Sequence, residues 1–283
     1  SPSRARTVGA RVADSGDVVN PAGRAVWITG ASSGIGAALA VAMAEAGARL
    51  ILSARHADRL EDVARRCRDA GAEAYVLPLD MAAPETFAAA HAQAGERVGT
   101  IDILVNNAGI GQRGGALETR LEVDRRILDV NFFGPLALTR EVAPAMVACG
   151  RGQLVVTSSV LGKFGAPTRS TYCASKHALH GWFDALRAEL SGSGVTVTLI
   201  CPGYVRTEIS RHALEADGSR HAEMDRGQLR GFSPEQCAQK MVRAIRRDVS
   251  EAYIGGIVEV GGVYLKRYWP QLFEWVIART KMS

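Results

Sequence analysis

The sequence predicts an α/β fold, in which a doubly wound parallel sheet of about seven strands carries helices on both faces as a three-layer α/β/α sandwich. From Arg24 onward, short β-branched apolar runs alternate with longer segments of helical periodicity, a pattern typical of βαβ units. A glycine-rich turn directly follows the first apolar run. The chain has 283 residues, 47% of them apolar and 22% charged, which is enough for one large domain with a substantial core.

Strands are expected where Val, Ile and Leu form short continuous runs, and helices where apolar residues recur about every 3.6 positions. The expected strands are 25–29, 49–54, 72–80, 101–109, 152–159 and 195–203, and 251–260 is expected to supply a seventh. The expected helices are 34–47, 57–71, 84–97, 118–149 and 170–190, with a further helix from Ser233 and Pro234. Gly47 and Gly71 are placed to end two of these helices.

The chain divides into a leader, one domain and a tail. Residues 1–23 are polar without a signal-peptide core, so we expect a flexible leader and no membrane anchor. No linker interrupts 24–260, which we interpret as a single domain. The polar segment 206–231 is expected to be either a lid over a site or a solvated loop. The aromatic and basic tail 261–283 is expected to pack on the chain's own body or on another subunit, before peripheral membrane contact.

Composition and charge exclude several classes of protein. The net charge of +5 comes without the Lys/Arg runs of a nucleic-acid binder, so no nucleic-acid partner is expected. No apolar run reaches the ~18 residues of a transmembrane helix. The five cysteines are odd in number and lack C-x-x-C spacing, which favours a reducing, cytoplasmic location over a disulfide framework. No Cys–His or carboxylate cluster suggests a metal, so none is expected.

The glycine-rich turn indicates a phosphate site. Gly30, Gly34 and Gly36 lie between the first strand and the first helix, where glycines let the backbone approach a pyrophosphate and the helix N-terminus offers free N–H groups. The spacing is G-x-x-x-G-x-G rather than the G-x-G-x-x-G of the usual dinucleotide fingerprint. An ordinary glycine-rich turn is the alternative.

The end of the second strand favours NADP over NAD. A carboxylate near this point usually accepts hydrogen bonds from the ribose 2′-hydroxyl of NAD. Here Arg55 and His56 follow the strand, and no carboxylate occurs before Asp58. A guanidinium at Arg55 suits a 2′-phosphate, although a solvent-facing arginine is the alternative. Asp80, at the end of the third strand, is expected either to accept from the adenine amino group or to cap the helix at Pro84.

Tyr172 and Lys176 lie four residues apart near the start of the helix 170–190, so their side chains share one helix face. A free phenol has a pKa near 10, and a nearby ammonium favours its ionised form. Taken alone, such a pair is more often simply exposed. His177 and His180 follow on the same helix and are expected to be solvated or packed histidines.

The motifs together resemble the short-chain dehydrogenase/reductase family, whose fold is of the Rossmann type. TGASSGIG (29–36), NNAG (106–109), Ser159, YCASK (172–176) and PGYVRT (202–207) occur in the family's order over 24–257. Longer stretches are similar to an NADP-preferring subgroup that includes 11β-hydroxysteroid dehydrogenases and dehydrogenase/reductase member seven.

The resemblance implies a catalytic role for four residues. Tyr172 matches the family's acid/base, and Lys176 matches the lysine that binds the nicotinamide ribose and lowers the phenol pKa. Ser159 matches the serine that holds the substrate carbonyl, so Ser159 and Tyr172 are the expected substrate contacts. Asn131 matches the asparagine that completes a water-linked proton relay to the lysine.

The motifs and the resemblance together give the residues expected to bind the cofactor, NADP(H). They are Gly30, Ser32, Ser33, Gly34, Ile35, Gly36, Arg55, His56, Asp80, Met81, Asn106, Ala108, Gly109, Tyr172, Lys176, Pro202, Gly203, Val205 and Thr207.

The resemblance therefore implies an NADPH-dependent carbonyl reductase, reversible as a secondary-alcohol dehydrogenase. It transfers hydride between nicotinamide and a small-molecule ketone or aldehyde, with Tyr172 as acid/base. The apolar tail and the subgroup point to a hydrophobic carbonyl of lipid, steroid or 3-oxoacyl type. By analogy with the family, a homodimer or homotetramer is expected. The alternative from another class is a non-catalytic NADP-binding redox sensor or assembly protein.

Overall fold

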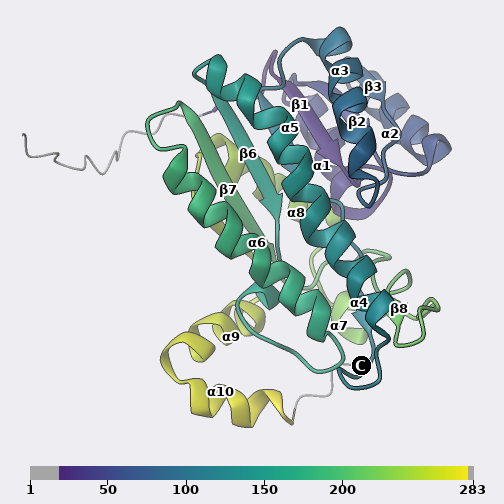
Figure 1. Cartoon of the computed structure of the whole chain (residues 1–283), viewed down its shortest axis with the longest axis vertical. Helices are drawn as coiled ribbons and strands as arrows, with labels where there is room; N and C mark the ends of the chain where they lie inside the picture. Colours follow the sequence, from purple (N-terminus) through teal and green to yellow (C-terminus); the bar gives the residue numbers. More distant parts are fainter. Residues whose placement is uncertain (1–18, 280–283) are drawn as a thin grey trace, which may run out of the picture.

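A seven-stranded parallel sheet forms the centre of the chain in a computed structural model, which describes residues 19–279 (Figure 1). The sheet has the order β3-β2-β1-β4-β6-β7-β9, and every neighbouring pair is parallel. The order reverses its direction between β1 and β4, where a doubly wound sheet opens a crevice at the carboxyl ends of its strands. The strands are β1 Ala25–Thr29, β2 Arg49–Ser53, β3 Ala74–Val76, β4 Ile103–Asn106, β6 Gly152–Thr157, β7 Val195–Pro202 and β9 Glu251–Ile254.

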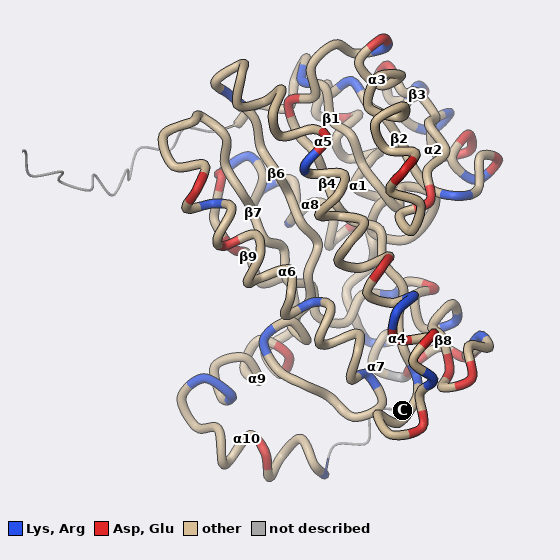
Figure 2. The backbone as a smooth tube through the Cα atoms, in the orientation of Figure 1, with Lys and Arg blue, Asp and Glu red and all other residues tan. Residues whose placement is uncertain are grey.

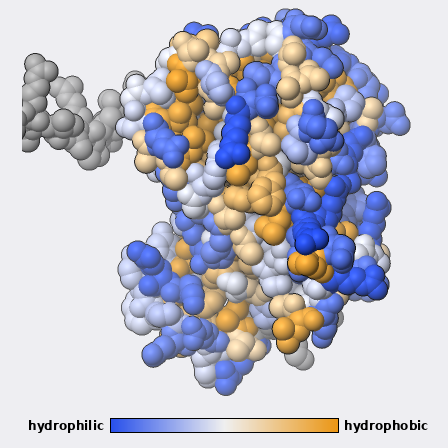
Figure 3. Space-filling view, viewed as in Figure 1, coloured by the Kyte–Doolittle hydropathy of each residue, from blue (hydrophilic) through white to orange (hydrophobic). Residues whose placement is uncertain are grey.

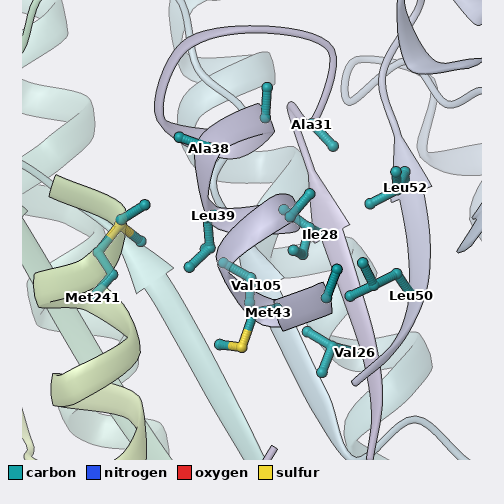
Figure 4. Packing of buried hydrophobic residues seen from close by; sticks show 14 of the residues in the cluster. Val26, Ile28, Ala31, Ala38, Leu39, Met43, Leu50, Leu52, Val105 and Met241 are labelled. Carbon is teal, nitrogen blue, oxygen red and sulfur yellow. The ribbon is translucent and has the colours of Figure 1, made fainter. Parts of the chain in front are cut away.

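Helices cover both faces of this sheet, as the sequence predicted. Alternate residues of β1 serve the two faces: Val26 and Ile28 belong to one buried cluster, and Ala25 and Trp27 to the other. Figure 4 shows the first cluster, in which Leu39 of α1 lies between Met241 of α8 and Ile28 of β1. One layer holds α1 Gly34–Glu45, α2 Ala57–Asp69 and α8 Pro234–Arg246, and the other holds α3 Phe87–Val98, α5 Gly134–Ala148 and α6 Ser170–Glu189.

The expected strand at 251–260 is wrong over its second half. β9 ends at Ile254, and α9 Ile257–Tyr268 begins after the pair Gly255–Gly256. Glycine lacks the side chain that a strand packs, so the pair interrupts the ladder and Gly256 takes the N-cap position. The tail therefore starts at residue 257, before the expected boundary at 260. It forms α9 and α10 Pro270–Ile277, which Figure 1 shows in yellow beside the body of the domain.

The long helix expected at 118–149 is one helical path with a defect. α4 Leu121–Leu128 passes through a π-helical turn, Asp129–Phe133, into α5. A π-helical turn inserts one extra residue into the hydrogen-bond ladder and is often found at functional sites. The expected strand 25–29 matches β1, whereas the other expected strands extend beyond the observed ones. The difference is largest for 72–80, of which only Ala74–Val76 is a strand.

The segment 206–231 is held in place by secondary structure. Its β8 Leu214–Glu215 pairs with β5 Gln112–Arg113, which follows β4, and its α7 Arg226–Leu229 is a single helical turn. The segment thus joins two loops that lie about 100 residues apart in sequence. This backbone pairing holds the segment although its sequence is polar.

Charged residues lie mainly on the outer helices and loops, whereas the sheet carries few of them (Figure 2). Among residues 19–279, none of the helices combines the length and apolar character that crossing a bilayer requires. Most of the expected leader, 1–23, and the last four residues of the tail lie outside the described residues.

Candidate functional site

A cavity of about 990 Å³ opens at the carboxyl edge of the sheet, beside β1, β4 and β6. It lies at the crevice that the reversed strand order creates. Most of the residues that the sequence singled out line it: Gly30, Ser32, Ser33, Ile35, Gly36, Arg55, His56, Asp80, Met81, Ala108, Gly109, Ser159, Tyr172, Lys176, Pro202, Gly203, Val205 and Thr207. Gly34, Asn106 and Asn131 do not line it.

The glycine turn between β1 and α1 is built for close packing. Gly30 has a φ of 66°, in the left-handed region that disfavours side chains. A Cβ on Gly36 would lie 2.2 Å from the Gly30 carbonyl oxygen, so no larger residue fits there. Ser33 at the N-cap of α1 makes no side-chain capping bond. Ser33, Ile35 and Gly36 place the start of α1 on the cavity wall, and unbonded N–H groups at the start of a helix are suited to bind an anion.

A basic rim surrounds the cavity near the end of β2. Arg55 and His56 lie here as expected, and the exposed Arg59 and the more distant Arg126 join them. Asp80 accepts hydrogen bonds from the Ala82 N–H at 3.0 Å and from Arg126 at 3.3 Å. Burial opposes ionisation of Asp80, but the Ala82 N–H and Arg126 together hold the pKa of its carboxyl below its usual value. Arg126 lies on α4, far from β2 in the sequence, so the residues around the end of β2 could not indicate that it joins them.

The structure corrects the choice between two adjacent asparagines. Asn106 is buried, and its side-chain amide donates to Thr139 Oγ1 at 2.9 Å, away from the cavity. Asn107 lines the cavity and fixes the glycine turn by donating to the Thr29 carbonyl oxygen at 3.1 Å. Successive residues of a strand point to opposite faces, so the motif NNAG alone does not show which of its two asparagines faces the cavity.

Tyr172 and Ser159 meet on the cavity wall. Tyr172 lies in the first turn of α6, and Ser159 caps the short 3₁₀ helix Val160–Gly162 by accepting from the Leu161 N–H at 3.1 Å. Burial raises the pKa of the Tyr172 phenol, and a side-chain hydrogen bond with Ser159 partly offsets that effect. The phenol is therefore protonated at neutral pH and has a proton to give.

Lys176 lies one turn further along α6, with only 4% of its surface exposed. Its Nζ donates to the Thr157 carbonyl oxygen at 2.9 Å and lies 5.8 Å from the centre of the Tyr172 ring. Burial lowers the pKa of Lys176 to about 8. The lysine thus brings a cationic group to the cavity floor at a considerable desolvation cost.

Asn131 lies behind the cavity wall, within the π-helical turn. Its Oδ1 accepts from the Ile110 N–H at 2.8 Å, and its Nδ2 donates to Ser175 Oγ at 3.1 Å. A Cβ on Gly109 would lie 3.3 Å from Asn131 Oδ1 and 3.5 Å from Lys176 Nζ. Because Gly109 has no side chain, the backbone at this residue passes close to both Asn131 and Lys176.

The end of the cavity farthest from the basic rim is apolar. Phe164, Leu265, Phe273 and Ile277 line it, and the last three belong to the tail helices α9 and α10. The rings of Phe164 and Phe273 lie 5.0 Å apart. The structure thus places the tail on the chain's own body, as the wall of the cavity.

His180, Cys201 and Glu251 come together beneath the site, with potential ligand atoms within 4.8 Å of one another. This cluster corrects the expectation that no Cys–His–carboxylate group exists. His180 is buried and packed against Ser158 Oγ at 3.0 Å, as expected of a core histidine. Glu251 already pairs with Lys163 at 2.9 Å, and burial raises the pKa of the Cys201 thiol. A protonated thiol beside a neutralised carboxylate is a poor donor set, so we assign no metal here.

The doubly wound sheet, the glycine turn and the cavity at the strand switch define a dinucleotide-binding protein of the Rossmann type. The family described as short chain dehydrogenase matches residues 24–218. The chain belongs to this family, the short-chain dehydrogenases/reductases (SDR), which are oxidoreductases.

Among its relatives, the chain is 40% identical to the "Dehydrogenase/reductase SDR family protein 7-like" of Anopheles gambiae over 262 residues, which cover 91% of this chain and 83% of the relative. It is 38% identical to "Dehydrogenase/reductase SDR family member 7B" of Mus musculus, covering 89% and 80%.

Solved structures show the same fold with cofactor bound. A short chain dehydrogenase/reductase from Burkholderia phymatum in complex with NAD is similar, with a TM-score of 0.80 and 28% identity over 90% of this chain and 96% of that one. An alcohol dehydrogenase from Thermococcus sibiricus complexed with 5-hydroxy-NADP has a TM-score of 0.72 and 27% identity over 83% and 97%. Similar proteins therefore bind either form of the cofactor.

Proposed function

We propose that the protein is an NADPH-dependent carbonyl reductase that is reversible as a secondary-alcohol dehydrogenase. The observation that carries this proposal is the meeting of Tyr172, Ser159 and Lys176 on one wall of a cavity whose other end holds the glycine turn. Such a cavity accommodates a dinucleotide along the sheet edge and a second small molecule beside it.

NADPH, when bound along the glycine turn, would supply a hydride to the carbonyl carbon of the substrate. The electron pair of the C=O π bond moves to the oxygen, and the Ser159 hydroxyl holds this developing alkoxide. Tyr172 then gives its proton to the same oxygen, which completes the alcohol and leaves a tyrosinate. The ammonium of Lys176 stabilises that tyrosinate. Asn131 is bonded separately to the Ile110 backbone and to Ser175, behind the same wall of the cavity.

The preference for NADP(H) rests on the basic rim. A 2′-phosphate accepts charge-assisted hydrogen bonds from guanidinium groups, and Arg55, Arg59 and Arg126 all line this part of the cavity. Asp58 also lines it, but it lies beyond Arg55 on α2 and not at the strand end where NAD-binding proteins carry their carboxylate.

The apolar side chains of the tail that line the cavity indicate the class of substrate. The apolar wall of α9 and α10 suits a lipid-like, steroid or 3-oxoacyl carbonyl that places its polar end at Ser159 and Tyr172. The same reasoning disfavours small hydrophilic carbonyls, which would leave this wall in contact with water.

The test is NADPH oxidation against a panel of lipid, steroid and small ketones. We expect turnover with the apolar members, and Tyr172→Phe should abolish it while NADPH still binds. Tyr75→Phe is the matched control, since Tyr75 lies on β3 away from this cavity and should keep full activity. Saturable NADPH binding without turnover in any form of the protein would instead indicate the non-catalytic sensor.

We also propose a homo-oligomer, in which α5 and the π-helical turn before it form the contact between subunits. Phe133 is 52% exposed and Val147 is 40% exposed, and Figure 3 shows apolar side chains on the face that α5 and α6 present. Light scattering after size exclusion tests the assembly, and a Phe133→Glu, Val147→Glu variant should reduce it to monomers.

A further inference from the structure

The helix that carries Tyr172 begins without a cap of its own. Arg169 occupies the N-cap position of α6 and makes no side-chain capping bond. The preceding Thr168 has a φ of 62°, which is strained for a residue other than glycine. A helix start of this kind needs support from elsewhere in the chain.

Gln112 on β5 supplies the missing cap. Its side-chain oxygen accepts from the N–H groups of Thr171 and Tyr172 at 2.8 and 3.0 Å. These are the two N–H groups that an N-cap side chain would normally bond. Gln112 is fully buried, so this support does not depend on solvent. The backbone of Tyr172 is thus anchored to β5.

β5 is in turn tied to the segment 206–231 by a buried charge cluster. Asp225, which precedes α7, accepts from Arg113 Nε at 3.1 Å and from Arg169 Nη2 at 2.9 Å, and a second oxygen–nitrogen contact joins it to Arg113. The exposed fractions of the side chains are 6% for Asp225, 11% for Arg113 and 4% for Arg169. One carboxylate therefore opposes two guanidiniums out of water.

Several residues of the segment 206–231, among them Ile209 and Gln228, line the cavity. We propose that Asp225 is a positioning residue that ties this segment to Tyr172, because its one carboxylate holds both Arg113 of β5 and Arg169 at the start of α6. A displacement of this segment is thereby passed to the start of α6 and to Tyr172. The inference rests on the proposed function for its catalytic consequence, although the link itself is a property of the free protein.

The cluster also sets the charge around the phenol. Tyr172 faces groups from four parts of the chain. They are Lys176 and Cys173 on its own helix, Ser159 before the 3₁₀ helix, Arg113 on β5, and Arg169. Burial and the Cys173 thiol raise the pKa of Tyr172, whereas Ser159, Arg113 and Arg169 lower it. Asp225 partly neutralises the two arginines, so changes at Asp225 and at Arg113 should move the ionisation of Tyr172 in opposite directions.

The first experiment compares Asp225→Asn with the native protein in alcohol oxidation as a function of pH. Oxidation needs the tyrosinate as base, so the rate rises with pH through the Tyr172 pKa. With one negative charge fewer beside Arg113 and Arg169, this rise should move to lower pH by roughly half a unit or more. kcat should also fall about tenfold or more, because the helix start loses its anchor, while NADPH affinity stays within about twofold. Glu223→Gln removes an exposed charge two residues away and should do neither.

A second variant keeps the proposal testable if Asp225→Asn fails to fold. Arg113→Gln leaves the Asp225–Arg169 pair intact and removes one cation, so the same rise in rate should move to higher pH. A merely structural role would shift neither profile, or both in the same direction, and either result overturns the proposal.

The ionisation is also followed without turnover, by the ultraviolet absorbance of tyrosinate as the difference between each variant and its Tyr172→Phe counterpart. Opposite shifts in this titration support the link between Asp225 and Tyr172 even if no carbonyl substrate is turned over. Such a result separates failure of the proposed function from failure of this inference.

Discussion

At the residue scale, the site depends on placing charged groups where water does not reach them. Lys176 is almost fully buried beneath the cavity, with the Thr157 carbonyl as its hydrogen-bond acceptor. One neutral acceptor does not offset the loss of hydration of an ammonium, which is why burial lowers the pKa of Lys176 to about 8. Stability and chemistry therefore oppose each other at this position.

Replacing Lys176 by methionine should stabilise the protein while abolishing turnover. In the unfolded chain the lysine has a pKa near 10.4. Between about pH 8 and that value the unfolded chain binds more protons than the folded one, so stability rises with pH across this window. Lys176→Met should raise the free energy of unfolding at neutral pH by roughly 1–3 kcal/mol, and this gain should shrink toward about pH 10.

Denaturant unfolding at both pH values measures this effect. The control is Lys163→Met, which removes a partly exposed ion pair with Glu251 and should give no comparable gain. A Lys176→Met protein that is less stable than the native one at neutral pH would show that the desolvation argument is wrong.

Arg55 should decide between the two forms of the cofactor. Arg55→Ala removes a guanidinium that we assign to the 2′-phosphate, so the Kd for NADPH should rise at least tenfold and that for NADH less than about twofold. Cofactor fluorescence titration measures both constants. Arg65→Ala, on the same side of the domain but outside the cavity, should change neither. An equal loss for both cofactors argues against the assignment.

At the element scale, the turn from β1 into α1 allows almost no variation. The Gly36 backbone passes so close to Gly30 that a methyl group would overlap the carbonyl oxygen. The sequence predicted this turn and its glycines, because the residue types themselves carry the backbone constraint. The π-helical turn at Asn131 had no such signature, because hydrogen bonds of Asn131 with Ile110 and Ser175, which are distant in the sequence, hold it.

Gly36→Ala should therefore destabilise the protein by several kcal/mol and abolish cofactor binding, since either the Gly30 backbone or the whole of α1 must move. Gly95→Ala is the matched substitution in α3, where no atom lies within 4 Å of the new Cβ. It should stabilise the protein by about 0.5–1 kcal/mol, as expected for alanine replacing glycine within a helix. Thermal unfolding with and without NADPH compares the two, and a well-folded, cofactor-binding Gly36→Ala protein would contradict the geometry.

At the scale of the whole molecule, the tail forms one wall of the cavity. Val263 of α9 and Phe273 of α10 join Val160 and Phe164 in a small buried cluster of their own, apart from the two large clusters that sandwich the sheet. The sheet thus positions the residues proposed to act in the reaction, and the last helices of the chain form the apolar end of the cavity.

Phe273→Ala should impair the binding of large substrates selectively. Loss of the ring that contacts Phe164 removes part of the apolar wall, so KM for a long-chain or steroid ketone should rise about tenfold, with little change for a small ketone. Trp275→Ala, on the same helix but 58% exposed, should leave both KM values unchanged. Steady-state kinetics with the two substrates decides, and equal effects on both would show that the tail supports the fold and not the substrate.

The sequence by itself determined the alternation of strands and helices, the glycine turn, the pairing of Tyr172 with Lys176 one helical turn on, and the motif order that indicated the family. These features are encoded locally, in residue types and short spacings. The tertiary structure alone decided that Asn107 and not Asn106 lines the cavity, that Arg126 joins the basic rim, and that α9 and α10 form the apolar wall. It also decided that Gln112 and Asp225 hold the start of α6. Each of these depends on strand register or on contacts between residues far apart in the chain, and local periodicity carries no information about either.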